Sequence, residues 1–307
     1  LLKFWGKPII NKPKRADYLN RLFSCLKLSQ TRFILVFIQN NLKIIEMKIK
    51  NTFIVCLLLT TTFSFAQKTV KATDILKDIK NGKSISYQNA TIVGVLDLTY
   101  MDEALKKLPN KKKSSWWSSG NSTNEIKKII EVKISFVNCT FKEDVLAYIP
   151  DEDSGYTFTA SFEEEAIFKN CVFERKAMFK YSRFERNSDF SGTSFTDDST
   201  FKYAKFDSDI NFTNTKFDEI ATFKYAKFSR NVSFYGSDFK DSAIFKYTKF
   251  NNGVSFKNTQ FKKDLNIKYM NVSGDFNITN MKVEYEIDSK YTKINGKSFD
   301  KYLLEKR

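Results

Sequence analysis

The sequence predicts an all-β fold, a four-sided β-solenoid with about 22 residues per coil and short helical caps at both ends. Nineteen phenylalanines between Phe162 and Phe261 are separated by alternating steps of six and five residues. The residue two positions before each of them is small or β-branched, as at Ala160, Ala166 and Cys171. Such an uninterrupted repeat is typical of a chain that winds around one continuous core.

The full repeat consists of two six-residue and two five-residue steps, because two kinds of segment alternate between the phenylalanines. One kind reads FKYAKF from Phe201 and from Phe223, and FKYTKF from Phe245. The other kind reads FKNCVF from Phe168 and FTNTKF from Phe212. Four inward phenylalanines in each period imply a four-sided coil, and successive coils should stack as strands do, about 4.8 Å apart.

The predicted solenoid covers residues 84–294, because the six and five spacings continue after Phe261 through Ile267 and Val272. FVNCTF at Phe136 matches FKNCVF at Phe168, but the distance between them is longer than one period, which predicts an insertion at 147–156. A longer insertion is expected at 101–124. An N-terminal cap at 67–83, with a helix over residues 73–82, and a C-terminal cap at 295–307 are expected to cover the ends of the core.

The small-x-Phe pattern over residues 87–294 resembles the pentapeptide-repeat family. This resemblance implies a right-handed four-sided β-helix, filled by a central Leu or Phe and by the small residue that precedes it. Alternate units here have six residues, so the corners are expected to depart from those of a regular twenty-residue coil. The resemblance says little about function, because function depends on the sites that a fold carries.

Residues 47–66 have the features of a secretory signal peptide. Lys48 and Lys50 precede an apolar run, and small residues lie before Gln67. Cleavage near Ala66–Gln67 would export the chain to the periplasm, the cell surface or the medium, and residues 1–46 would be an irregular upstream extension. The alternative is an uncleaved anchor, although an apolar run of about twelve residues is short for a membrane span. No transmembrane span is expected in the mature chain.

Charge and composition disfavour an enzyme and a generally basic protein. Without the eleven Lys and Arg and the two acidic residues of positions 1–66, the net charge falls from +16 to +7. The chain has no His, which removes the usual general base and the usual metal ligand. A core filled with Phe leaves no cleft for paired catalytic carboxylates. The sequence therefore predicts a non-enzymatic protein with no cofactor and no metal.

The main candidate binding site is a basic, aromatic stripe on the surface of the coils. If each Phe and the residue two before it point inward, the FKYxKF segments place a Lys row, a Tyr row and a second basic row side by side. The stripe consists of Lys180, Tyr181, Arg183, Lys202, Tyr203, Lys205, Lys224, Tyr225, Lys227, Lys246, Tyr247, Lys249, Lys268 and Tyr269, and the rows continue at Lys290, Tyr291 and Lys293 after an interruption at Asn271. Lysines about 4.8 Å apart repel by about 0.9 kcal/mol before salt screening, which indicates an anionic partner. The alternative is that duplication of the repeat copied surface residues together with core residues.

The first insertion holds a second candidate, a binding loop with Lys111, Lys112, Lys113, Trp116 and Trp117. Trp is costly to expose to water and is favoured at interfaces. Two alternatives stay open: a Trp folds back over a coil, or the loop pairs with the acidic second insertion.

Cys139 and Cys171 occupy the same position in consecutive coils. They are interpreted as small inward residues. The alternative is a disulfide, because a coil step of about 4.8 Å lies within the usual Cα separation of about 4.4–6.8 Å, and an exported compartment permits oxidation.

These features predict an exported bacterial binding or scaffold protein whose stripe and Trp loop face an anionic envelope polymer, such as an acidic polysaccharide, or a partner protein. Pentapeptide-repeat proteins that imitate DNA suggest the alternative of a cytosolic DNA mimic, although those need an acidic face. Direct nucleic-acid binding, with bases stacked on Tyr, is not expected after export. A purely structural spacer and an end-to-end homodimer stay open.

Overall fold

The computed structural model describes residues 42, 43, 45, 47, 48, 50, 68–108 and 124–305. The chain divides into two compact units, Leu1–Ala66 and Gln67–Arg307. The described residues of the first unit are helical. The expected upstream extension and signal peptide thus lie almost wholly outside the described residues. None of the described helices is both long and apolar enough to cross a membrane.

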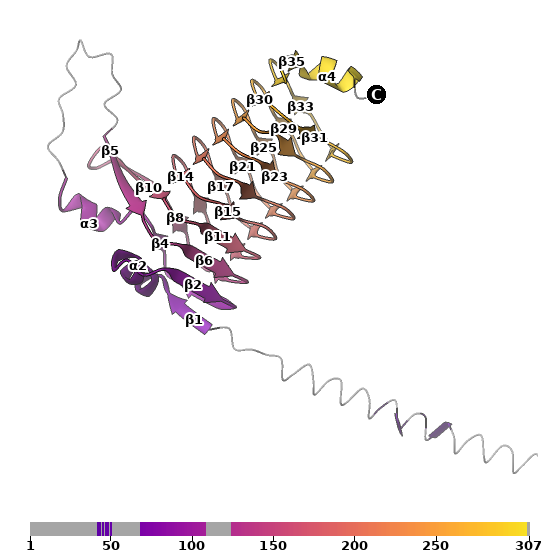
Figure 1. Ribbon diagram of the computed structural model, residues 1–307. Helices are drawn as coiled ribbons and strands as arrows, with labels where there is room; N and C mark the ends of the chain where they lie inside the picture. The colour runs from indigo at the N-terminus through magenta and orange to yellow at the C-terminus, as the bar shows by residue number, and fades with distance from the viewer. Residues whose placement is uncertain are drawn as a thin grey trace, which may run out of the picture. The chain divides into compact units, whose positions relative to one another are not determined.

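Four parallel sheets, here called A to D, form the sides of the second unit (Figure 1). Sheet A contains β1 (Lys68–Lys71), β3 (Ala90–Val93), β7 (Thr140–Phe141), β12 (Val172–Phe173), β16 (Ser194–Phe195), β20 (Lys216–Phe217), β24 (Asp238–Phe239), β28 (Gln260–Phe261) and β32 (Lys282–Val283). Sheet B contains β2 (Ile85–Gln88), β6 (Ile134–Val137), β11 (Ala166–Lys169), β15 (Ser188–Asp189), β19 (Ile210–Asn211), β23 (Val232–Ser233), β27 (Val254–Ser255) and β31 (Phe276–Asn277).

Sheet C contains β4 (Leu96–Asp97), β8 (Val145–Leu146), β13 (Ala177–Met178), β17 (Ser199–Thr200), β21 (Ala221–Thr222), β25 (Ala243–Ile244), β29 (Leu265–Asn266) and β33 (Ile287–Asp288). Sheet D contains β5 (Glu125–Ile130), β10 (Tyr156–Phe162), β14 (Arg183–Phe184), β18 (Lys205–Phe206), β22 (Lys227–Phe228), β26 (Lys249–Phe250), β30 (Asn271–Val272), β34 (Lys293–Ile294) and β35 (Lys297–Ser298). The chain visits sheets C, D, B and A in turn, so sheets D and A lie on opposite sides of each coil.

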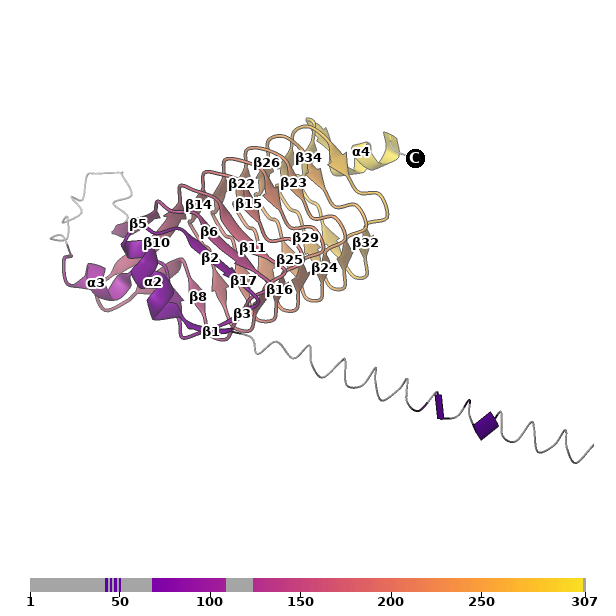
Figure 2. The ribbon, with the colours of Figure 1, turned by 60° about the horizontal axis from the view of Figure 1, so that its bottom comes forward.

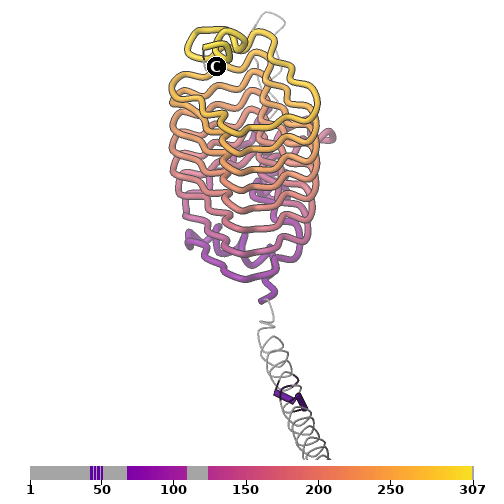
Figure 3. The backbone as a smooth tube through the Cα atoms, turned by 90° about the vertical axis from the view of Figure 1, so that its right-hand side faces the viewer, coloured from indigo at the N-terminus to yellow at the C-terminus, as the bar shows by residue number. Residues whose placement is uncertain are grey.

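The register confirms the predicted period and fold class. Ala177 lies opposite Ser199, and Ser199 lies opposite Ala221, so each residue pairs with the one at the same repeat position in the next coil. The coils stack one on another along the solenoid (Figure 3). Because every coil repeats the same four short strands, residues at one repeat position become direct neighbours in space.

The core consists of stacked phenylalanine rings. Phe223 is fully buried, and its ring lies parallel to those of Phe201 and Phe245, with centroids 5.0 and 4.9 Å away. The small residues two positions before each Phe are also buried, as predicted. Several of these residues carry a hydroxyl that donates to a carbonyl of the preceding coil, as Thr248 Oγ1 does to Phe223 O at 2.8 Å. The hydroxyls of Ser182 and Ser199 are buried without such a partner. These bonds satisfy polar atoms that would otherwise be costly to bury.

The N-terminal end differs from the prediction in one element. Residues Lys68–Lys71 form β1, which pairs with β3 and adds a strand to sheet A. Helix α2 (Ala72–Lys80) therefore starts right after a strand, with Lys71 at its N-cap, and buries Ala72, Ile75 and Ile79. Only Val70 of β1 is buried, so this short strand carries too little alternation to be recognised from sequence.

Both insertions interrupt the period where the sequence places them. Pairs between β2 and β6 join residues 49 apart, and pairs between β6 and β11 join residues 32 apart. The first insertion contains helix α3 (Met101–Leu105), and the candidate Trp loop lies outside the described residues. The second insertion is a hairpin, in which β9 (Tyr148–Asp151) pairs antiparallel with β10.

Short helices lie at both ends of the solenoid (Figure 2). Helix α4 (Phe299–Glu305) follows the antiparallel pair of β34 and β35. Its Phe299 and Tyr302 side chains are buried, and the Tyr302 hydroxyl donates to Phe276 O at 2.7 Å. The helix thereby covers apolar surface of the last complete coils.

Candidate functional site

The structure brings the residues of the predicted stripe together along sheet D and the corner between sheets C and D. In the second basic row, Arg183 pairs with Lys205, Lys205 with Lys227, and Lys227 with Lys249. Asn271 interrupts this row and Lys293 resumes it, at the positions that the sequence indicates. The stripe is therefore continuous in space over the coils between residues 180 and 249.

The Tyr row forms a ladder of rings stacked face to face. Centroids of successive rings are 4.9, 4.7, 4.7, 4.6 and 4.8 Å apart. The first four of these pairs are within 8° of parallel. The ladder members are Tyr181, Tyr203, Tyr225, Tyr247, Tyr269 and Tyr291. Ring faces inside the ladder are covered by neighbouring rings, while the ring edges stay partly exposed, as at Tyr181, which is 40% exposed.

All six ladder tyrosines have a left-handed backbone, with φ between 60° and 63°. The corner between sheets B and A needs the same conformation and uses Asn or Gly for it, for example Asn170, Gly192 and Asn214. A left-handed conformation costs a non-glycine residue about 1–2 kcal/mol, and ring stacking returns about 0.5–1.5 kcal/mol. The geometry of the corner alone therefore favours Asn or Gly over Tyr.

Sequence analysis missed this left-handed corner, although a signal for it was present. Tyr is the third residue of FKYAKF, and Asn or Gly is the third residue of the alternating segments, such as FTNTKF and FYGSDF. Aligning the two segment types would have placed each Tyr at a position that Asn and Gly usually fill.

The first Lys row lies against the Tyr ladder. The ammonium groups of Lys202, Lys224 and Lys246 are 5.5, 5.3 and 5.5 Å from the ring centroid of the next residue, within cation–π range. Partial burial, followed by the charges of Lys180 and Lys224, holds the pKa of Lys202 below its usual value. This row thus stays close to the protein surface, and among its described members only Lys268 has an acidic partner, Asp288 at 4.0 Å.

A groove of about 530 Å³ runs between the Tyr ladder and the second basic row, and we call it the Tyr–Lys groove. Its two walls are the ladder residues Tyr181, Tyr203, Tyr225 and Tyr247 and the basic residues Arg183, Lys205, Lys227 and Lys249. Ala226, together with Glu125 and Lys127 of β5, completes the lining. Four coils contribute the Tyr and basic residues, and β5 of an earlier coil adds Glu125 and Lys127, so the groove follows the long direction of the solenoid.

Most of the lysines around the groove have no acidic partner. The arginine of the second basic row does have an acidic partner. Arg183 Nε lies 2.5 Å from Asp207 Oδ2, and this hydrogen bond raises the pKa of the guanidinium. Among the described residues, no ion pair involves Lys205, Lys227 or Lys249. On three successive coils, one exposed and unpaired lysine therefore faces the groove.

Some lysines at other repeat positions are neutralised across coils. Lys240 lies 2.8 Å from Asp218, and Lys263 lies 2.8 Å from Asp241. The hydrogen bond with Asp241 raises the pKa of Lys263, whereas the pKa of Lys202 in the stripe is lowered.

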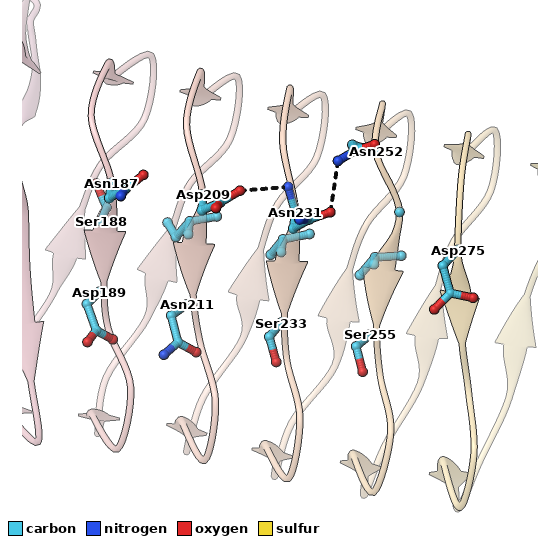
Figure 4. A pocket seen from close by; sticks show the side chains of 14 residues that line it. Asn187, Ser188, Asp189, Asp209, Asn211, Asn231, Ser233, Asn252, Ser255 and Asp275 are labelled. Carbon is cyan, nitrogen blue, oxygen red and sulfur yellow. Dashed lines mark hydrogen bonds between the residues drawn. The ribbon is translucent and has the colours of Figure 1, made fainter.

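A second groove, of about 510 Å³, follows sheet B (Figure 4). Asp189, Asn211 and Ser233 lie in one row there, but each accepts a hydrogen bond from the backbone N–H two residues further on, at 2.8, 2.9 and 3.2 Å. Asp209 and Asn231 are likewise joined, since the Asn231 backbone N–H donates to Asp209 Oδ1 at 3.1 Å. These polar groups stabilise the corners, and we assign no ligand to this groove.

Cys139 and Cys171 are free and buried, so the structure contains the small inward residues rather than the alternative disulfide. Each sulfur instead lies against backbone carbonyls, Cys139 Sγ at 3.4 Å from Val137 O and Cys171 Sγ at 3.3 Å from Phe136 O. The hydrogen bond with Cys139, together with burial, raises the pKa of the Cys171 thiol. In the described part of the chain, no cluster of three or more His, Cys, Asp or Glu could hold a metal ion.

Comparison with known proteins identifies the repeat. The family described as pentapeptide repeats (9 copies) matches residues 158–205, 190–238, 201–249 and 223–270. No curated protein and no solved structure matches the chain. The matched region includes the four coils that line the Tyr–Lys groove. The family model therefore detects pentapeptide repeats over residues 158–270 of this chain.

Proposed function

We propose that this chain is an exported, non-enzymatic binding scaffold that holds an extended anionic partner, an envelope polymer or a partner protein, in the Tyr–Lys groove. The observation that carries the proposal is the row of unpaired Lys205, Lys227 and Lys249 beside a strained Tyr ladder. A spacer would not need either feature. A DNA mimic would need acidic rather than basic groups in these positions.

Binding of a polyanion by the full chain should weaken as salt concentration rises, and it should depend on the second basic row. A variant in which Lys205, Lys227 and Lys249 are all changed to Gln loses about 1 kcal/mol of attraction per lysine. For the three lysines this corresponds to about a hundredfold loss in affinity. Isothermal titration calorimetry with a heparin-like polymer at two salt concentrations measures this loss.

The matched control replaces Lys169, Lys216 and Lys257 with Gln. These lysines are exposed and lie at the end of β11 in sheet B, on sheet A, and at the corner between sheets B and A, respectively. The control removes the same net charge but leaves the groove intact, so the affinity of this variant for the polymer should stay within a few-fold of wild type. Equal losses in the two triple variants, or no salt-sensitive binding by the wild type, would refute a role for the groove.

Export is supported by the signal-peptide features of residues 47–66. N-terminal sequencing after cell fractionation of the protein made from its own gene should find the protein outside the cytoplasm, with Gln67 as its N-terminal residue. An intact N-terminus in the cytosol would contradict export and would restore the basic residues of positions 1–66 to the functional protein.

A further inference from the structure

The stacking of the Tyr ladder limits which polyanion the groove can bind, if the proposed function holds. Proteins that bind single-stranded nucleic acids stack bases on exposed aromatic faces. Here both faces of Tyr203 and of Tyr225 are covered by neighbouring rings, at 4.9, 4.7 and 4.7 Å. Along this part of the ladder, a base therefore finds no free ring face on which to stack. The apolar face of a neutral sugar likewise finds no free ring face to pack against.

The ladder instead offers ring edges and phenol hydroxyls to the groove. The edge of an aromatic ring is electropositive, and a phenol hydroxyl donates hydrogen bonds. Both features favour contact with the oxygen atoms of anionic and hydroxyl groups. The opposite wall supplies ammonium donors from Lys205, Lys227 and Lys249.

The repeat of the groove defines the spacing of the groups that it can bind. Successive coils are about 4.8 Å apart. Each offers one Tyr edge and one basic side chain, which is unpaired on three of the four coils. An extended hexose polymer advances by nearly one coil per sugar, and a uronate carries one carboxylate on each sugar. Phosphates of B-form DNA follow one another at about 3.4 Å along each strand, which does not match one cation per coil.

We infer that the Tyr–Lys groove binds an acidic polysaccharide with one carboxylate per sugar, which lies along the solenoid axis with one sugar on each coil. The carboxylates face Lys205, Lys227 and Lys249, and sugar oxygens accept hydrogen bonds from the Tyr hydroxyls. The coils from Tyr181 to Tyr247 accommodate four sugars; three of them face an unpaired lysine, and the fourth faces Arg183, which already pairs with Asp207.

The experiment titrates the full chain with oligogalacturonates of two to eight sugars and with oligothymidylates of equal charge. Affinity for the uronates should rise steeply up to the tetramer and only slowly beyond it. The oligothymidylate should bind at least tenfold more weakly than the uronate of equal charge. If it binds as tightly, the inference is wrong while the proposed function stands. If neither polymer binds, both are wrong.

A pair of variants tests the ladder itself. One variant replaces both Tyr203 and Tyr225 by Asn. Asn tolerates the left-handed backbone of the corner, so this change removes only the ring edges and hydroxyls. The control is the double replacement of Tyr235 and Tyr285, which are exposed outside the stripe, with Asn. The ladder variant should lose at least tenfold in tetragalacturonate affinity without losing thermal stability, and the control should lose little. Equal affinities of the two variants would overturn the role of the ladder.

Discussion

Replacing Phe223 with Asp should unfold the coils around it. The Phe223 side chain is completely buried, and its ring lies within 5.5 Å of those of Phe201, Phe212, Phe234 and Phe245. Loss of a buried Phe ring costs about 3–5 kcal/mol, and a carboxylate without a partner in the same place adds a further desolvation penalty. The total is comparable to the whole stability of an ordinary domain, about 5–15 kcal/mol.

Circular dichroism with thermal unfolding measures this effect. Phe223→Leu is the control, since an apolar side chain of similar size should lower the stability by no more than about 1–3 kcal/mol. In a solenoid each coil contacts only its neighbours, so the Asp variant should also expose nearby coils to limited proteolysis. A Phe223→Asp protein with the melting temperature of wild type would mean that this ring is not in the core.

Replacing Gly253 with Ala should give the largest loss of stability among single-methyl changes at the corners. Gly253 has φ of +87°, and a Cβ there would lie 2.5 Å from Asp275 O and 2.9 Å from Asp275 N in the next coil. These are backbone atoms, so the clash can be relieved only by moving two coils apart. We expect about 1–2 kcal/mol from the left-handed backbone and about 1–3 kcal/mol more from the clash.

Gly296→Ala separates these two contributions. Gly296 has φ of +79°, but a Cβ there would meet nothing within 4 Å. This control should therefore show only the backbone contribution, and the difference between the two variants in urea unfolding reports the clash. Equal destabilisation by both changes would mean that the coils do not approach closely at Gly253.

Much of the fold could be predicted because the spacing of the phenylalanines along the chain identifies both the core residues and the period. Phe201 and Phe223 share a repeat position, so their stacking follows once the four-step period is recognised. The interruption of the second basic row at Asn271 follows from the same register. The strand β1 could not be predicted, because it joins sheet A only through pairing with β3 and has one buried side chain.

The sequence by itself determined the four-sided solenoid, the inward residues and the residues that share each surface row. It could do so because parallel stacking turns a repeat position directly into a spatial neighbour. Only the tertiary structure decided that the Tyr rings stack in a left-handed corner and that Lys205, Lys227 and Lys249 lack acidic partners. The physical reason is that ring stacking and ion pairing depend on where side chains of adjacent coils meet, as Lys263 meets Asp241, and not on spacing along the chain alone.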